Sequence, residues 1–371
     1  MIKQQILFAD GGYAALDDWL RDNGIERFLL VCGASMRQLA IHDYFEGLTR
    51  RTGITFVCFS DFQPNPVYES VVEGVRIFDR ERCQAIVAVG GGSAMDVAKC
   101  IKLYCHMDHD KDYWGQQIVS NDVKLLAVPT TAGTGAEATR FAVIYYQGAK
   151  QSVTHDSAIP SAVLMDSSAL QSLPLYQRKS TMLDALSHAV ESFWSVNSTA
   201  ESKDYSREAL AQIMANGQGY LANQPDANAA MLHASYLAGK AINIAQTTAG
   251  HAMCYRLTSL YGLAHGHAAA LCNRVLFPWM LHHTDDCIDP RGEDYLRQTF
   301  DEIAQAMGCR TAEEAAGKFV SIVAGLQMEI PKAAEEDYAV LKTSVNPTRL
   351  KNHPIRLDED TLERLYRDIL R

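Results

Sequence analysis

Four side chains in the second half of the sequence have the types and spacing of a metal site. Asp184 and His188 are four residues apart, so a helix would present both on one face. Two further histidines, His251 and His265, are fourteen residues apart. Three imidazoles and one carboxylate suit Fe(II), Zn(II) or a similar borderline ion. His267 is a less favoured alternative to His265, and the other histidines are expected to be ordinary core or surface residues.

Two polar loops in the first half have the composition of a phosphate-binding edge. In residues 89–96, Val-Gly-Gly-Gly-Ser-Ala-Met-Asp, the glycines open a helix and let backbone N–H groups approach an anion. Residues 129–137, Pro-Thr-Thr-Ala-Gly-Thr-Gly-Ala-Glu, supply hydroxyls suited to phosphate or ribose. Neither loop is the GxGxxG fingerprint, and either alone could be an ordinary turn. Because both follow strand-like runs, they should meet at the carboxyl edge of one sheet, where we predict a nucleotide site.

The elements that must position these residues differ between the two halves. Strand-like apolar runs alternate with helix-like segments in the first half, which predicts a Rossmann-like α/β domain with a parallel sheet. The second half is rich in Ala, Leu, Met and Ser from about Gln177 onward and reads as an all-α domain. We expect the boundary near Leu173–Pro174, giving domains 1–174 and 175–371. The expected strands are 27–32, 54–59, 85–89 and 124–128.

Composition excludes several classes of function. The chain has 371 residues and a formal net charge of −10, which argues against nucleic acid as a partner. No apolar stretch approaches the roughly 18 to 20 residues of a membrane span, and no signal-peptide pattern is present. Nine cysteines without CxxC spacing indicate free thiols rather than a cysteine metal site. We therefore expect a soluble cytoplasmic protein without a membrane partner.

Taken together, the motifs resemble the iron-containing (group III) alcohol dehydrogenase family. The resemblance covers nearly the whole chain and rests on four segments in order: residues 90–99, residues 129–135, Asp184-Ala-Leu-Ser-His188, and His251 followed by His265-Gly266. It implies an α/β nucleotide-binding domain, a helical metal-binding domain, an active site in the cleft between them, and a homodimer. It also implies an NAD(P)-dependent oxidoreductase that interconverts a small aldehyde and a primary alcohol.

The resemblance also assigns roles to single residues. It makes Asp184, His188, His251 and His265 the metal ligands. Lys150 matches a lysine that reaches the nicotinamide ribose, and we count it among the catalytic candidates as well as the cofactor-binding ones. The remaining residues matched to the cofactor site are Gly91, Gly92, Ser93, Asp96, Thr130, Thr131 and Thr134.

Two positions depart from the family pattern. Many NAD-using members carry an acidic residue after the first strand, whereas this chain has Gly33. Without that carboxylate nothing repels a 2′-phosphate, so we expect NADPH to be accepted as well as NADH. Many members also carry a histidine four residues after the first late metal histidine, where this chain has Tyr255. A phenol there can donate a proton or merely pack; water or a cofactor ribose hydroxyl are the other candidate donors.

The substrate is suggested by two arginines close to these motifs. Arg140 follows the threonine loop and Arg256 follows Tyr255. A guanidinium can bind an anionic group in bidentate fashion, although structural salt bridges explain both arginines equally well. The runs 139–142, 255–259 and 265–271 resemble the phosphonoacetaldehyde reductase branch of the family. Phosphonoacetaldehyde, reduced to 2-hydroxyethylphosphonate, is thus the leading candidate, and a generic short-chain aldehyde is the alternative.

Two other classes of protein are alternatives to an alcohol dehydrogenase. A sugar-phosphate lyase of the dehydroquinate synthase type shares the implied architecture and also uses NAD. That group typically has a glutamate as first metal ligand and a denser basic pocket, so Asp184 argues against it. A nucleotide-binding regulatory protein without catalysis would have no need for the complete set of four ligands.

Overall fold

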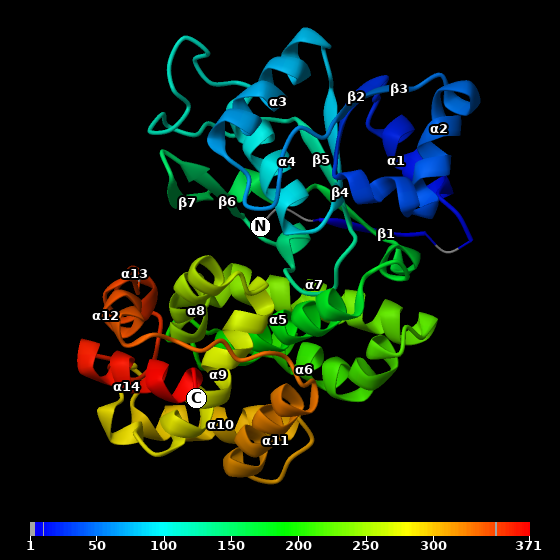
Figure 1. Cartoon of the computed structure of the whole chain (residues 1–371). Helices are drawn as coiled ribbons and strands as arrows, with labels where there is room; N and C mark the ends of the chain where they lie inside the picture. The colour runs from blue at the N-terminus through cyan, green and yellow to red at the C-terminus, as the bar shows by residue number, and fades with distance from the viewer. Residues whose placement is uncertain (1–3, 10, 346) are drawn as a thin grey trace. The chain divides into compact units, whose positions relative to one another are not determined.

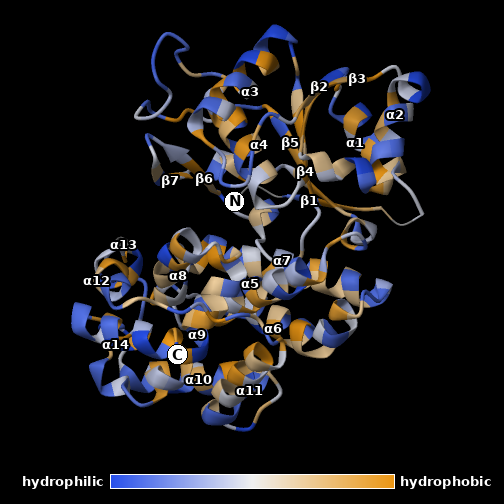
Figure 2. Cartoon of the chain, in the orientation of Figure 1, coloured by the Kyte–Doolittle hydropathy of each residue, from blue (hydrophilic) through white to orange (hydrophobic). Residues whose placement is uncertain are grey.

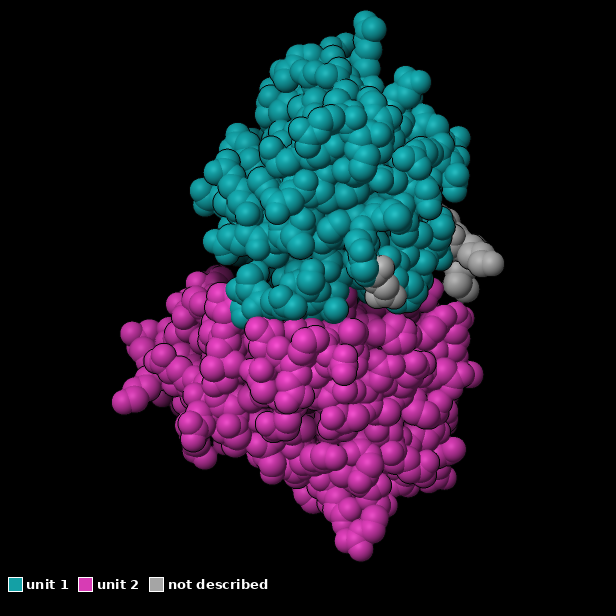
Figure 3. Space-filling model, turned by 90° about the vertical axis from the view of Figure 1, so that its right-hand side faces the viewer, with its two compact units in different colours: residues 1–173 teal, residues 174–371 magenta. Residues whose placement is uncertain are grey.

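The structure is a computed structural model that describes residues 4–9, 11–345 and 347–371. The chain divides into two compact units, Met1–Leu173 and Pro174–Arg371, which are shown in different colours in Figure 3. In the parts of the chain that the structure describes, no helix has both the length and the apolar composition needed to cross a bilayer.

Unit 1 is built on a parallel sheet. Its strand order is β1-β8-β5-β4-β2-β3, and every neighbouring pair is parallel. The central strands β2, β4 and β5 are almost completely buried, and Figure 2 colours them as hydrophobic. The strands are β1 (Gln5–Phe8), β2 (Arg27–Cys32), β3 (Thr55–Phe59), β4 (Ala85–Gly90), β5 (Lys124–Pro129) and β8 (Ala162–Met165).

Burial of the central strands on both faces requires cover on both sides, which the helices of unit 1 supply (Figure 1). A separate antiparallel hairpin, β6 (Phe141–Tyr146) and β7 (Ala149–Thr154), follows the threonine loop. The α-helices of unit 1 are α1 (Ala14–Asp22), α2 (Ala40–Thr52), α3 (Tyr68–Arg80) and α4 (Gly92–Tyr104).

Unit 2 is helical, and its described residues contain no β-strand. Helix α5 is buried along nearly its whole length and packs against α6, α7 and α9. The helices are α5 (Leu175–Trp194), α6 (Ala200–Leu221), α7 (Pro225–Ala245), α8 (Ala249–Tyr261), α9 (His265–Leu281), α10 (Glu293–Ala306), α11 (Ala312–Gly325), α12 (Glu335–Thr343), α13 (Pro347–Leu350) and α14 (Glu359–Ile369). The predicted fold class, a parallel α/β unit followed by an all-α unit, is confirmed.

Candidate active site

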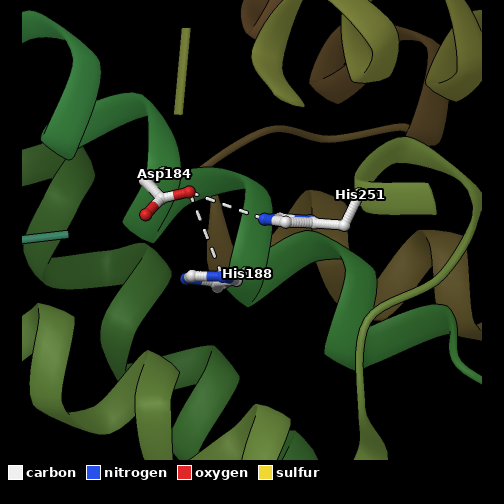
Figure 4. A group of neighbouring side chains, drawn as sticks. All are labelled: Asp184, His188 and His251. Carbon is white, nitrogen blue, oxygen red and sulfur yellow. Dashed lines mark ion pairs between the residues drawn. The ribbon is translucent and has the colours of Figure 1, made fainter. Parts of the chain in front are cut away.

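The buried core of unit 2 contains a cluster of possible metal ligands. Helix α5 presents Asp184 and His188, and α8 presents His251, with one ligand atom of each lying within 4.8 Å of the others. Oδ1 of Asp184 is 3.5 Å from Nε2 of His251 and 4.0 Å from Nε2 of His188 (Figure 4). The two imidazole rings are stacked, with centroids 4.5 Å apart. The structure thus brings together three of the four predicted ligands.

The fourth predicted ligand, His265, lies beside this cluster. It is the first residue of α9, and its ring centroid is 5.3 Å from that of His251. Its Nδ1 atom is 3.5 Å from Sγ of Cys254. His265 is half-buried, whereas the other three side chains are buried, so the cluster is least enclosed at His265.

The polar atoms of this cluster fit a divalent cation. Oδ1 of Asp184 and Nε2 of His251 are buried, and neither has a hydrogen-bond partner among the described residues. Orphaned buried polar atoms are costly, and a cation between a carboxylate and imidazoles would satisfy both. Burial alone raises the pKa of Asp184, but His188, His251 and His265 around it lower that pKa to well below its usual range. The carboxylate is therefore charged and able to bind a cation.

Glu191 contacts the cluster and was not singled out in the sequence analysis. Its Oε1 atom is 2.6 Å from Nδ1 of His251 and accepts a hydrogen bond from Asn273 at 2.8 Å. Its Oε2 atom accepts from the backbone N–H and the hydroxyl of Thr248. Burial raises the pKa of the Glu191 carboxyl, but His251 and these hydrogen bonds lower it to about 2. A signal was present, because Asp184, His188 and Glu191 have the i, i+4, i+7 spacing of one helix face.

Close approach of two helices places His265 near the cluster. A Cβ atom added to Gly266 would lie 2.1 Å from the carbonyl oxygen of Ser180 and 2.5 Å from Cβ of Asp184. Only glycine lets α9 pack this tightly against α5. Gly266, which follows His265 in the motif, is therefore required by this helix packing, and the motif alone did not reveal this.

Tyr255 occupies the position where the family pattern has a histidine. It lies one helical turn after His251 on α8, and its ring stacks on His265 with centroids 5.5 Å apart and planes 15° apart. Burial raises the pKa of the phenol, against the opposing effect of Arg349. His267, the less favoured alternative to His265, contacts a different residue: its Nδ1 atom lies 3.2 Å from the hydroxyl oxygen of Tyr176.

The glycine and threonine loops predicted to bind the cofactor, together with Gly33, follow neighbouring strands at one edge of the sheet. Gly33 follows β2, the glycine loop follows β4 and the threonine loop follows β5, and these strands are neighbours in the order β5-β4-β2. A Cβ atom on Gly91 would lie 3.2 Å from Cγ2 of Thr131, and one on Gly92 would lie 3.4 Å from Cγ2 of Thr134. The two loops are therefore in contact.

This edge has the features of an anion site. Gly91 caps α4 without a side-chain hydrogen bond, which leaves first-turn N–H groups available, and Ser93 lies in that turn. The hydroxyl oxygen of Thr131 is buried and lacks a hydrogen-bond partner within the described part of the chain. Thr130 holds the two loops in register, because its N–H donates to the carbonyl of Gly90 at 3.0 Å.

Behind this edge lies a group of buried charges. Nζ of Lys99 donates to Oγ1 of Thr139 at 3.0 Å and to the carbonyl of Phe141 at 2.7 Å. Burial lowers the pKa of Lys99 to about 8 and raises that of Asp96 to about 7, while each charge partly offsets the shift of the other. Lys150, on β7, also lowers the pKa of Asp96, so two residues predicted for the cofactor site interact electrostatically.

The two arginines proposed for the substrate differ in their surroundings. Nη1 of Arg140, in unit 1, forms an ion pair with Oδ1 of Asp156 at 3.0 Å. Arg256, in unit 2, is half-buried, and its Nε atom has no hydrogen-bond partner among the described residues. The salt bridge that was the alternative explanation for Arg140 is thus present.

Comparison with known proteins assigns the chain to a family. Residues 3–167 match the family described as iron-containing alcohol dehydrogenase, and residues 179–369 match the C-terminal region of the Fe-containing alcohol dehydrogenase family. The chain belongs to the iron-containing alcohol dehydrogenase family. As a member of this family it is an oxidoreductase that acts on alcohols or aldehydes, which confirms the predicted class of enzyme. This result favours that prediction over the lyase and the non-enzymatic alternatives.

Three relatives within or close to this family were compared. Phosphonoacetaldehyde reductase of Streptomyces viridochromogenes is 33% identical over 312 residues, covering 80% of this chain and 79% of the relative. The crystal structure of sulfoacetaldehyde reductase from Bifidobacterium kashiwanohense in complex with NAD+ has a TM-score of 0.86 at 26% identity and covers 100% of this chain and 98% of that one. A 1,3-propanediol oxidoreductase structure has a TM-score of 0.87 at 26% identity and covers both chains completely.

Proposed function

We propose that this chain reduces a small aldehyde to a primary alcohol with NAD(P)H, using one Fe(II) or Zn(II) ion held by Asp184, His188, His251 and His265. The observation that carries the proposal is the pair of buried atoms Oδ1 of Asp184 and Nε2 of His251, which face each other at 3.5 Å and have no hydrogen-bond partner among the described residues. A hydrophobic core does not tolerate such atoms without a compensating ligand.

Within this proposal the protein's own residues bind and orient. A bound metal ion would polarise the aldehyde carbonyl as a Lewis acid, and the reduced nicotinamide would supply the hydride. Glu191 accepts a hydrogen bond from the Nδ1–H group of His251, so that Nε2, which faces Asp184, would be the atom that binds the metal ion. Tyr255 packs on His265 and is our candidate to donate the proton that the product oxygen needs.

The nucleotide-binding role rests on the sheet edge of unit 1. We propose that Gly91, Gly92 and Ser93 bind the pyrophosphate at the N-terminus of α4, where the helix dipole favours an anion. The remaining contacts are assigned to Gly33, Thr130, Thr131, Thr134, Asp96 and Lys150. The NAD+ bound by the similar sulfoacetaldehyde reductase supports a nicotinamide cofactor.

For the substrate we propose an aldehyde that carries a negative charge, with phosphonoacetaldehyde as the leading candidate. Two of the similar proteins are named for such aldehydes, one with a phosphonate and one with a sulfonate group. The similar 1,3-propanediol oxidoreductase supports the alternative of a neutral substrate. We further propose a cytoplasmic homodimer, which light scattering of the purified protein would test.

The proposed function is tested by NADPH and NADH oxidation with a panel of aldehydes, with and without added Fe(II). His251→Ala and His265→Ala should lose both the bound metal and turnover while keeping the circular dichroism of the wild type. His109→Ala, which removes an exposed histidine of unit 1, is the matched control. Full activity of a metal-free His251→Ala/His265→Ala double variant would rule out the metal mechanism.

A further inference from the structure

Besides Arg140 and Arg256, a further arginine, Arg349 in unit 2, is linked to the proposed metal ligands through the ring of Tyr255. Arg349, on α13, places its guanidinium carbon 5.0 Å from the centroid of the Tyr255 ring. Its Nη1 atom donates to Oγ1 of Thr247 at 3.1 Å. No ion pair that the described residues form involves this arginine, so a half-buried cation is held in place without a neutralising carboxylate.

The same tyrosine ring connects this cation to the metal cluster. Tyr255 stacks on His265 at 5.5 Å, and His265 lies 5.3 Å from His251, measured between ring centroids. Arg349 is therefore separated from the outermost proposed ligand by a single aromatic ring. This arrangement lies entirely within unit 2, at the side where the cluster is least enclosed.

We infer that Arg349 binds the acidic group of the substrate, a phosphonate or sulfonate on the carbon next to the aldehyde. The inference rests on the proposed function, since it takes the carbonyl to be held at the metal cluster. A guanidinium presents two parallel N–H donors that match the oxygens of such a group. Contact with Tyr255 and Thr247 fixes the side chain beforehand, which reduces the entropy lost on binding.

The two arginines named from the sequence have weaker positions for this role. Arg140 already has Asp156 as an ionic partner. Arg256 follows Tyr255 directly on α8, so its side chain leaves the helix about 100° away from that of Tyr255. Arg349 contacts the ring of Tyr255, which in turn stacks on a proposed metal ligand.

The test compares charged and neutral aldehydes on Arg349→Ala and Arg349→Lys. The substrates are phosphonoacetaldehyde, sulfoacetaldehyde and propanal, and the measure is the ratio of kcat/KM for each acidic aldehyde to that for propanal. Loss of a charge-assisted hydrogen bond should lower this ratio roughly ten- to a hundredfold in Arg349→Ala. Arg349→Lys keeps the positive charge but loses the two parallel N–H donors of the guanidinium, so its ratio should lie between those of the wild type and Arg349→Ala. Arg310→Ala, which removes an exposed arginine of unit 2, is the control and should leave the ratio unchanged.

A binding measurement keeps the test independent of turnover. Ethylphosphonate is titrated by calorimetry into the zinc-loaded protein without nucleotide, and Arg349→Ala should weaken its binding roughly ten- to a hundredfold. If Arg349→Ala fails to fold, Arg349→Lys carries the same comparison. Wild-type protein that reduces none of the aldehydes would contradict the proposed function, whereas the ethylphosphonate result decides the role of Arg349 by itself.

Three results would overturn the inference. Equal loss of kcat/KM on acidic and neutral aldehydes would make Arg349 a structural residue. Unchanged ethylphosphonate binding in Arg349→Ala would show that the anion is held elsewhere. A larger fall of the ratio in Arg256→Ala than in Arg349→Ala would move the anion site to Arg256. The relative ratios of the phosphonate and the sulfonate identify which acid the site prefers.

Discussion

Nδ1 of His251 lies 2.6 Å from Oε1 of Glu191, and both side chains are buried in the core of unit 2. A carboxylate can only accept at this position, so Nδ1 of His251 carries a proton, and the neutral imidazole would offer the lone pair of Nε2 to a metal ion. Asn273 and Thr248 hold the carboxylate in turn. The orientation of a proposed metal ligand is thus set by a residue that is not itself a proposed metal ligand.

Glu191→Gln should therefore lower the affinity for the metal without unfolding the protein. Partners of this kind contribute roughly 10- to 100-fold in metal affinity, and the amide keeps the size of the carboxylate while losing its charge. Competition with a chelator measures the effect. Glu314→Gln, an exposed change in the same unit, serves as the control. Metal affinity equal to that of the wild type would show that Glu191 has no positioning role.

Gly266→Ala should destabilise unit 2 and disturb the metal cluster together. The new methyl group would lie 2.1 Å from a backbone oxygen and 2.5 Å from Cβ of Asp184, so α9 must move away from α5. Overpacking of this kind typically lowers the free energy of unfolding by roughly 1 to 3 kcal/mol, and we expect the upper end here because backbone is displaced. Urea unfolding and metal content give the two measurements.

The matched control for this change is Gly317→Ala. That glycine also lies inside a helix, α11, but its added Cβ atom would have no neighbour within 4 Å. It should stabilise the protein by up to about 1 kcal/mol, because alanine is the better helix former. Similar destabilisation by both substitutions would show that the contact between α9 and α5 is not the cause.

The sequence predicts a contact in the site when the two residues lie within a few turns of the same helix. Asp184 and His188 share a helix face, so their pairing follows from helix periodicity alone. His251 and His265 come from the starts of two other helices, and only the family pattern joined them to that pair. Arg349 lies in a short helix far along the chain from Tyr255, and no periodicity relates them. Contacts of that kind come from tertiary packing.

The strands of unit 1 were likewise predicted where the local sequence pattern is strong and missed where it is weak. The expected strands at 27–32, 54–59, 85–89 and 124–128 correspond to β2, β3, β4 and β5, which carry continuous apolar runs. Strands β1 and β8, of four residues each, were missed because such short runs hardly stand out from their surroundings. The β6–β7 hairpin turns at Gln147 and Gly148, which both adopt the positive φ of a type I′ turn. Gly148 was the signal in the sequence for this turn, and it was not used.

Glu137→Gln should change how stability depends on pH. Glu137 is 1% exposed and its Oε1 atom has no hydrogen-bond partner among the described residues. Burial raises the pKa of this carboxyl from 4.5 to about 7, against the opposing charge of Lys99. The folded protein therefore keeps a proton that the unfolded chain releases, and the stability this gives is lost as the pH rises from about 4.5 to 7.

Glutamine stays neutral throughout, so the variant should lose less stability than the wild type between pH 5 and pH 8. A pKa raised by this amount corresponds to a difference on the order of 3 kcal/mol. Urea unfolding of both proteins at the two pH values measures it. Groups that do not interact with Glu137 titrate alike in both proteins and drop out of the comparison. Parallel pH profiles would mean that Glu137 ionises normally.

The choice between NADPH and NADH should be controlled at Gly33. This residue follows β2, next to the strand that carries the glycine loop, and has no carboxylate to repel a 2′-phosphate. We therefore predict that the wild type uses NADPH at least as well as NADH. A hundredfold preference for NADH, which corresponds to roughly 2.7 kcal/mol, would show that another group excludes the phosphate.

Gly33→Asp makes the cause of this preference testable, because the position can accept a side chain. Gly33 has φ of −83°, which any residue adopts, and a Cβ atom there would meet nothing closer than Oγ of Ser35 at 4.0 Å. A carboxylate at this place should repel the 2′-phosphate and accept hydrogen bonds from the ribose of NADH. We expect the ratio of kcat/KM for NADPH to that for NADH to fall roughly tenfold or more, a change of about 1.4 kcal/mol. Gly33→Asn matches the size without the charge, so an equal fall in that variant would attribute the effect to steric hindrance instead of electrostatic repulsion.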